Sequence, residues 1–136
     1  MRKLTAALLA FVLTSPAALW AQTAQEAIQS VIAQQLDAFR ASDVPQAFTF
    51  AAPSIQSMFQ SPERFGQMVR DGYPMVWQPG PERYLETEAT PGGQSQIVMI
   101  PDADGQMHFL RYSLIETDGT WRINGVWVLR SEALGA

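Results

Sequence analysis

The feature that most restricts the fold is a block of helix breakers at Pro74, Pro79, Gly80 and Pro81. Proline has a fixed φ and no backbone N–H, so no long helix can pass through this block. Before the block, apolar residues recur at helical spacing, and after it the aromatic and β-branched content rises. The chain is therefore predicted to fold as helices followed by strands.

Three helices are predicted before the block. The first is amphipathic, with a buried stripe formed by Ile28, Val31, Ile32, Leu36 and Phe39. The second begins with Asp43 as cap and Pro45 in its first turn, and Pro53 ends it. The third begins at Ser61, again followed by proline, and ends at Gly72.

Four strands are predicted after the block, at residues 83–88, 94–100, 107–116 and 120–129. The connections are short and rich in Gly, Pro and Asp, as tight reversals require. Short connections make neighbouring strands antiparallel. The predicted fold class is therefore α+β, with three N-terminal helices packed on a curved four-stranded antiparallel sheet.

Alternation along the strands predicts which side chains share a face. In the third strand, His108, Leu110, Tyr112 and Leu114 fall on one face. In the fourth, Trp121, Ile123 and Trp127 alternate with Arg122, Asn124 and Val128. Both faces of the sheet carry large apolar groups, so a second copy of the chain could cover the outer face in a homodimer. The first strand is read as a solvated acidic edge formed by Glu82, Tyr84, Glu86 and Glu88.

The N-terminus has the three parts of a bacterial secretory signal peptide. Arg2 and Lys3 precede an apolar run at residues 4–13, and small residues lead to Ala21, where cleavage is expected. The run is too short to span a bilayer, which takes about 20 residues, so no stable membrane anchor is expected after cleavage. The alternatives are an uncleaved anchor or a buried core helix. The predicted organisation is a signal peptide at residues 1–21, one domain at residues 22–136, and a periplasmic or secreted location.

Composition excludes several classes of function. The chain has no cysteine, which rules out thiol catalysis, disulfides and thiolate metal sites. Its net charge is already −4, and loss of Arg2 and Lys3 makes the mature domain more acidic. Such a domain without a basic run is a poor candidate for binding nucleic acid or an anionic membrane surface.

Several segments resemble a known family. Ala38-Phe39-Arg40, residues 65–69, residues 72–77 and the closing strand at residues 121–126 are similar to the bacterial family called domain of unknown function 4864. The order of helices and strands also resembles the cone-shaped fold of nuclear transport factor two and ketosteroid isomerase. That resemblance implies a concave cavity but no particular activity, because the fold hosts isomerases, dehydratases, cyclases and binding modules.

A few side chains are candidates for a site. Tyr73, Trp77, His108 and Tyr112 are predicted to line a ligand pocket, with the tyrosine hydroxyl available to a carbonyl oxygen. Asp71 and His108 are the candidate acid–base groups, although each is also read as an ordinary surface residue. No catalytic residue is assigned outright, because no acid and base pair is evident.

No cofactor or metal is predicted. The segment Asp102-Ala103-Asp104-Gly105 resembles the start of a calcium loop but lacks the later acidic ligands, so it is read as a hairpin turn. The five methionines after the signal could ligate copper, but they are scattered and fit core positions.

The leading functional hypothesis is an exported, non-catalytic module that binds a small apolar molecule or an envelope protein, because binding side chains outnumber reactive ones. The alternatives are a cofactor-free isomerase, dehydratase or hydrolase that uses Asp71 or His108 with a tyrosine hydroxyl, and a purely structural envelope protein.

Overall fold

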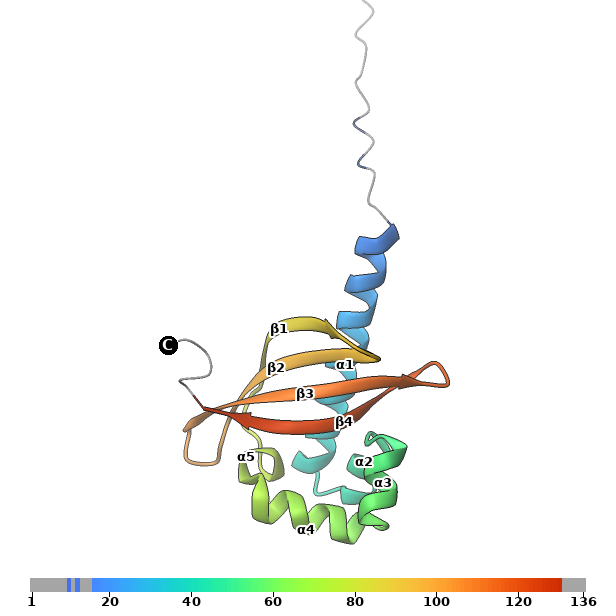
Figure 1. Cartoon of the computed structure of the whole chain (residues 1–136). Coiled ribbons are helices and arrows are strands. Elements are labelled where there is room, and N and C mark those ends of the chain that lie inside the picture. Colours follow the sequence, from blue (N-terminus) through green and yellow to red (C-terminus); the bar gives the residue numbers. More distant parts are fainter. Residues whose placement is uncertain (1–9, 11, 13–15, 131–136) are drawn as a thin grey trace, which may run out of the picture.

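A computed structural model describes residues 10, 12 and 16–130 of the chain. Five helices precede four strands (Figure 1). The helices are α1 (Pro16–Arg40), α2 (Val44–Thr49), α3 (Pro53–Phe59), α4 (Pro62–Gly72) and α5 (Pro74–Trp77). The strands are β1 (Arg83–Thr90), β2 (Gly93–Pro101), β3 (Met107–Thr117) and β4 (Thr120–Leu129).

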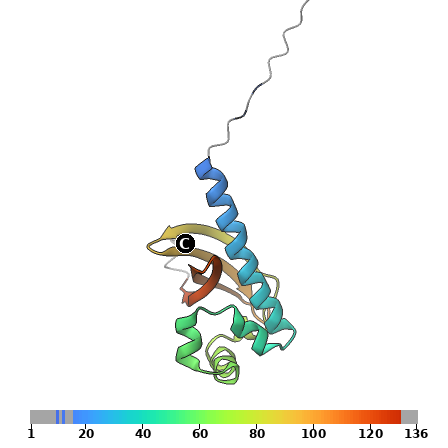
Figure 2. The ribbon, with the colours of Figure 1, turned by 90° about the vertical axis from the view of Figure 1, so that its right-hand side faces the viewer.

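The strands form one sheet in the order β1-β2-β3-β4, with every neighbouring pair antiparallel. Helix α1 crosses one face of this sheet, and α2 to α5 gather beside its β4 edge (Figures 1 and 2). Ile28, Ile32 and Leu36 of α1 are fully buried in one core with Val98 and Leu110 of the sheet. The predicted class is confirmed: the fold is α+β, with N-terminal helices packed against a four-stranded antiparallel sheet.

Two of the predicted helix starts use the expected caps. The Asp43 carboxylate accepts a hydrogen bond from the Gln46 backbone N–H at 3.2 Å, and the Ser61 hydroxyl accepts one from Arg64 at 3.3 Å. Each bond satisfies a backbone donor that the first helical turn leaves free. The predicted caps therefore begin α2 and α4, and each of these helices has proline in its first turn.

The short helices α3 and α5 are absent from the sequence prediction. The sequence pattern marks Pro53 and Pro74 as helix breakers, but each is the first residue of a new helix. Proline suits this position because its missing N–H would have no helical partner there. Pro53 therefore does not end α2, which stops at Thr49.

A bulge divides β1 between Tyr84 and Thr87. The fully buried Gln96 amide in β2 donates to the Leu85 and Glu86 carbonyl oxygens at 3.2 and 3.3 Å, which the bulge turns toward it. The predicted solvated face of Glu82, Tyr84, Glu86 and Glu88 is correct for the exposed Glu86 and Glu88 but wrong for Tyr84. Tyr84 is half-buried against the core, whereas Glu86 is exposed, because the extra residue breaks the alternation.

A second bulge lies in β4, where Ser113 pairs with Gly125 but Leu114 pairs with Ile123. Asn124 is the extra residue. The prediction that Trp127 shares a face with Ile123 was therefore wrong: Ile123 is buried in the core, and Trp127 is 55% exposed on the other face. Val126, not Trp127, lies on the inner face of the sheet, opposite Tyr112.

The expected signal peptide falls mostly outside the described residues, which include neither Arg2 nor Lys3. Helix α1 begins at Pro16 and continues through Ala21, the expected cleavage point. No helix in the described part of the chain is both long enough and apolar enough to cross a membrane.

Candidate functional site

The candidate site is an apolar cleft of about 410 Å³ between the second half of β4 and helices α3 and α4. Helix α1 contributes the buried side chains of Gln35 and Phe39. The remaining lining residues come from the segment before α3, from α3, α4 and α5, and from β4: Ala51, Ile55, Met58, Phe59, Phe65, Met68, Val69, Tyr73, Val76, Ile123, Asn124, Gly125, Val126 and Trp127.

Phenylalanine rings form the helical wall of this cleft. The Phe65 ring lies at the centre, 5.9 Å from the Phe59 ring, 6.1 Å from Phe39 and 5.2 Å from Phe48, measured between centroids. Tilted and edge-on rings at these distances stabilise one another as well as burying area. Phe39, Phe59 and Phe65 line the cleft, so its aromatic wall comes from α1, α3 and α4, and Phe48 of α2 packs against Phe65 without lining the cleft.

The polar groups of the cleft are neutral. The Tyr73 hydroxyl donates to the Val126 carbonyl oxygen at 3.0 Å, and the Gln35 amide donates to the Ala47 carbonyl at 3.2 Å. Ser54 donates to the Asn124 side-chain oxygen at 3.0 Å. Among the described residues, no carboxylate, histidine, lysine or arginine lines the cleft. Its chemistry therefore suits an uncharged, apolar occupant.

Tyr112 lies in the core behind the cleft wall, not in the cleft lining. Its side chain is fully buried, and its hydroxyl has no hydrogen-bond partner among the described residues. Burial raises the pKa of Tyr112, and the nearby Tyr84 hydroxyl, Glu82 carboxylate and Tyr73 hydroxyl raise it further. Burial therefore favours the neutral phenol.

His108 lies at the β2–β3 hairpin and does not line the cleft. Its Nε2 is 2.8 Å from the Asp102 carboxylate, which also accepts the backbone N–H groups of Asp104 and Gln106. The His108 hydrogen bond is the main cause of a lowered Asp102 pKa. Asp102 thus closes a hairpin turn, and within the described residues no three potential ligands gather as a metal site.

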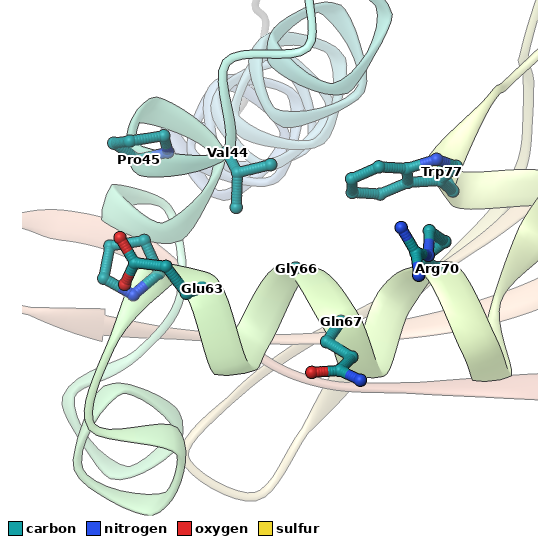
Figure 3. Close-up of a pocket in the computed structure, with 8 residues that line it drawn as sticks. Val44, Pro45, Glu63, Gly66, Gln67, Arg70 and Trp77 are labelled. Atoms are coloured by element: carbon teal, nitrogen blue, oxygen red, sulfur yellow. The ribbon is translucent and has the colours of Figure 1, made fainter.

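Asp71 and Trp77 also lie outside the cleft. Asp71 is exposed on α4, 3.9 Å from the Arg70 guanidinium. Trp77 borders a second hollow of about 490 Å³ between α2, α4 and α5 (Figure 3). In that hollow, Trp77 and Arg70 lie on one side of Gly66 and Val44 lies on the other. The two charged residues of its wall, Glu63 and Arg70, are exposed to solvent.

Of the predicted site residues, the structure therefore places only Tyr73 in the cleft. Tyr112 adjoins it through Val126, its partner across the β3–β4 ladder. The prediction missed the contribution of α3, although Ile55 and Phe59, four residues apart after Pro53, were a signal for one apolar helical turn. It also missed Asn124 and Val126, whose direction depends on the bulge.

Comparisons with known proteins identify the family but no activity. A family model described as a domain of unknown function, DUF4864, matches residues 21–136. No curated protein matches the chain. Among solved structures, Aln2 from a Streptomyces species is similar over 90% of this chain and 97% of its own, with 16% identity and a TM-score of 0.48.

Proposed function

The chain belongs to the DUF4864 family, and because that family's description assigns no activity, we propose from the cleft itself that the protein is a binding module for an uncharged apolar group. The observation that carries the proposal is the lining of the 410 Å³ cleft: aromatic and aliphatic side chains with a few neutral polar groups. Binding sites for small molecules commonly combine these two elements.

The positions of the candidate acid–base groups favour binding over catalysis. A general base must come within hydrogen-bond reach of the proton it removes. Asp71 is exposed on α4, and His108 is held by Asp102 at the start of β3. Neither group lines the cleft, so a substrate bound there would meet only neutral polar side chains, those of Gln35, Tyr73 and Asn124.

The proposal includes export from the cytoplasm. The order of Arg2 and Lys3, an apolar run and small residues is typical of a signal peptide. Among the residues of α1 whose burial is described, the fully buried ones begin at Ile28, after the expected cleavage point at Ala21. Cleavage there would leave the core stripe of α1 intact.

Binding can be tested with a neutral fluorescent probe, N-phenyl-1-naphthylamine, which emits strongly in apolar surroundings. We expect saturable enhancement by the purified protein. Met58→Glu places a charge at the cleft rim, where Met58 is 69% exposed, and should weaken binding by about tenfold, equivalent to about 1.4 kcal/mol.

The matched control is Met107→Glu, because Met107 is 63% exposed at the start of β3 and does not line the cleft. This variant should bind the probe as the unmodified protein does. Circular dichroism establishes that both variants are folded. Equal affinity in Met58→Glu, or an equal loss in both variants, would contradict the cleft as the binding site.

A further inference from the structure

Gln35 is a buried polar side chain in the wall of the cleft. It lies on α1, is 3% exposed and lines the cleft together with Phe39. Its Nε2 donates to the Ala47 carbonyl oxygen at 3.2 Å. That bond identifies the two ends of the side-chain amide, because a carbonyl oxygen can only accept a hydrogen bond. The other end of the amide, Oε1, is therefore an acceptor.

The Gln35 Oε1 atom accepts no hydrogen bond from the described residues, in which the bond to Ala47 is the interaction of this amide. In the same part of the chain, the Tyr112 hydroxyl is the only fully enclosed side-chain polar atom that lacks a partner. Gln35 Oε1 is therefore not enclosed by the protein, and it is open to the cleft that its side chain lines. A hydrogen-bond acceptor on the α1 wall is thus available to an occupant.

The β4 wall offers a hydrogen-bond donor. Asn124 Oδ1 accepts the Ser54 hydroxyl at 3.0 Å, which leaves the Asn124 amino group without a partner among the described residues. A protonated amine would meet no carboxylate in the described lining, and a buried unpaired charge is costly. A hydroxyl is neutral, donates one hydrogen bond and can accept others. It therefore suits a wall that combines a free acceptor with a free donor.

The cost of an unpaired acceptor favours a ligand that carries such a hydroxyl. Water can donate to Gln35 Oε1 while the cleft is open, and a purely apolar ligand that displaces solvent would leave this oxygen buried without a hydrogen bond. We propose that the cleft binds a neutral apolar alcohol or phenol whose hydroxyl donates to Gln35 Oε1. This inference rests on the proposed function, since it specifies the class of apolar molecule that the cleft receives.

The test compares two ligands that differ in one hydrogen-bond donor. 2-Naphthol is a neutral phenol at pH 7, whereas 2-methoxynaphthalene has the same rings and an oxygen that can only accept. Equilibrium dialysis against the full chain measures both affinities. 2-Naphthol should bind about tenfold more tightly, because only this ligand satisfies Gln35 Oε1.

Two variants of α1 assign this preference to one residue. Gln35→Met removes the acceptor at similar side-chain length, and the two ligands should then bind within about twofold of each other. Gln34→Met is the matched control, because Gln34 is exposed on the same helix and does not line the cleft. The control should keep the tenfold preference for 2-naphthol.

A spectroscopic readout in the unmodified protein does not depend on either variant folding. The side-chain carbonyl carbon of Gln35 should move downfield in the carbon NMR spectrum when 2-naphthol binds, because its oxygen then accepts a hydrogen bond from the ligand. 2-Methoxynaphthalene should not produce this shift.

The outcomes separate this inference from the proposed function. If both naphthalenes bind alike, if the methyl ether binds more tightly, or if the preference persists in Gln35→Met, the hydroxyl proposal is overturned and the apolar cleft stands. If 2-naphthol binds without moving the Gln35 carbonyl signal, the hydroxyl proposal is also overturned. If neither naphthalene nor N-phenyl-1-naphthylamine binds, both proposals fall.

Discussion

Tyr73 and Tyr112 lie on either side of Val126, yet only one of their hydroxyls has a described partner. Tyr73 donates to the Val126 carbonyl, whereas the fully buried Tyr112 hydroxyl has no partner among the described residues. A buried hydroxyl without a hydrogen bond loses its hydration and gains nothing in return. Removal of the hydroxyl is therefore expected to have opposite effects on the free energy of unfolding at the two positions.

Replacing Tyr112 with Phe should raise the free energy of unfolding by about 1 kcal/mol, because it removes an unpaired buried polar group. Replacing Tyr73 with Phe should lower it by about 1 kcal/mol, because the bond to Val126 is lost. Urea unfolding at pH 7 measures both changes. A loss of stability in Tyr112→Phe would mean that the hydroxyl is held by a buried water or another partner.

At the scale of elements, α4 approaches α2 closely at Gly66. A Cβ atom at Gly66 would lie 2.7 Å from a methyl carbon of Val44, closer than side chains in folded proteins come. Gly66 is buried inside α4, where glycine has poor helix propensity, so close packing and local preference are in conflict here. The close approach of α2 to α4 therefore accounts for the glycine at position 66.

The element-scale prediction follows from that conflict. Gly66→Ala should lower the free energy of unfolding by about 1 to 3 kcal/mol, since overpacking outweighs the gain in helix propensity of about 1 kcal/mol. Val44→Ala in the same chain should restore much of the loss. Gly72→Ala is the matched control, because a Cβ there meets nothing within 4 Å. Thermal unfolding of these variants and the unmodified protein checks this, and a Gly66→Ala protein as stable as the control would refute it.

At the scale of the whole molecule, the cleft is built by both halves of the chain. The bulge at Asn124 turns Val126 inward, and α3 supplies the facing wall. The described buried residues of α1 begin at Ile28, beyond the expected signal cleavage after Ala21. An exported molecule would therefore keep the core contacts of α1.

We predict that the protein expressed with its own N-terminus in a Gram-negative host is recovered from the periplasm with an intact mass that begins at Gln22. Its melting temperature should lie within about 3 °C of that of the full chain, because every residue of α1 that is described as buried follows the cleavage point. Mass spectrometry and circular dichroism give the two readouts. Recovery of the full-length chain from the cytoplasm or the inner membrane would contradict export.

The sequence by itself determined the class of fold. Periodicity, capping residues such as Asp43 and Ser61, and glycine turns act locally, so they predicted α1, α2 and α4, the four strands and their antiparallel order. The sequence also identified Tyr73 as a cleft residue. These features depend on residues that are neighbours in the chain.

Only the tertiary structure decided which side chains meet. Each bulge inserts one extra residue into a strand whose side chains alternate between the two faces. Trp127 therefore lies on the face opposite Ile123, and Glu86 and Glu88 lie on the face opposite Tyr84. The bulge in β1 is held by Gln96, a residue of the next strand, so no local pattern marks it. Proline gave a similar ambiguity at Pro53, because a ring that can end one helix can also begin the next. The faces of the sheet and the wall of the cleft depend on the two bulges and on the helix that begins at Pro53. Each of these features depends on contacts between distant parts of the chain.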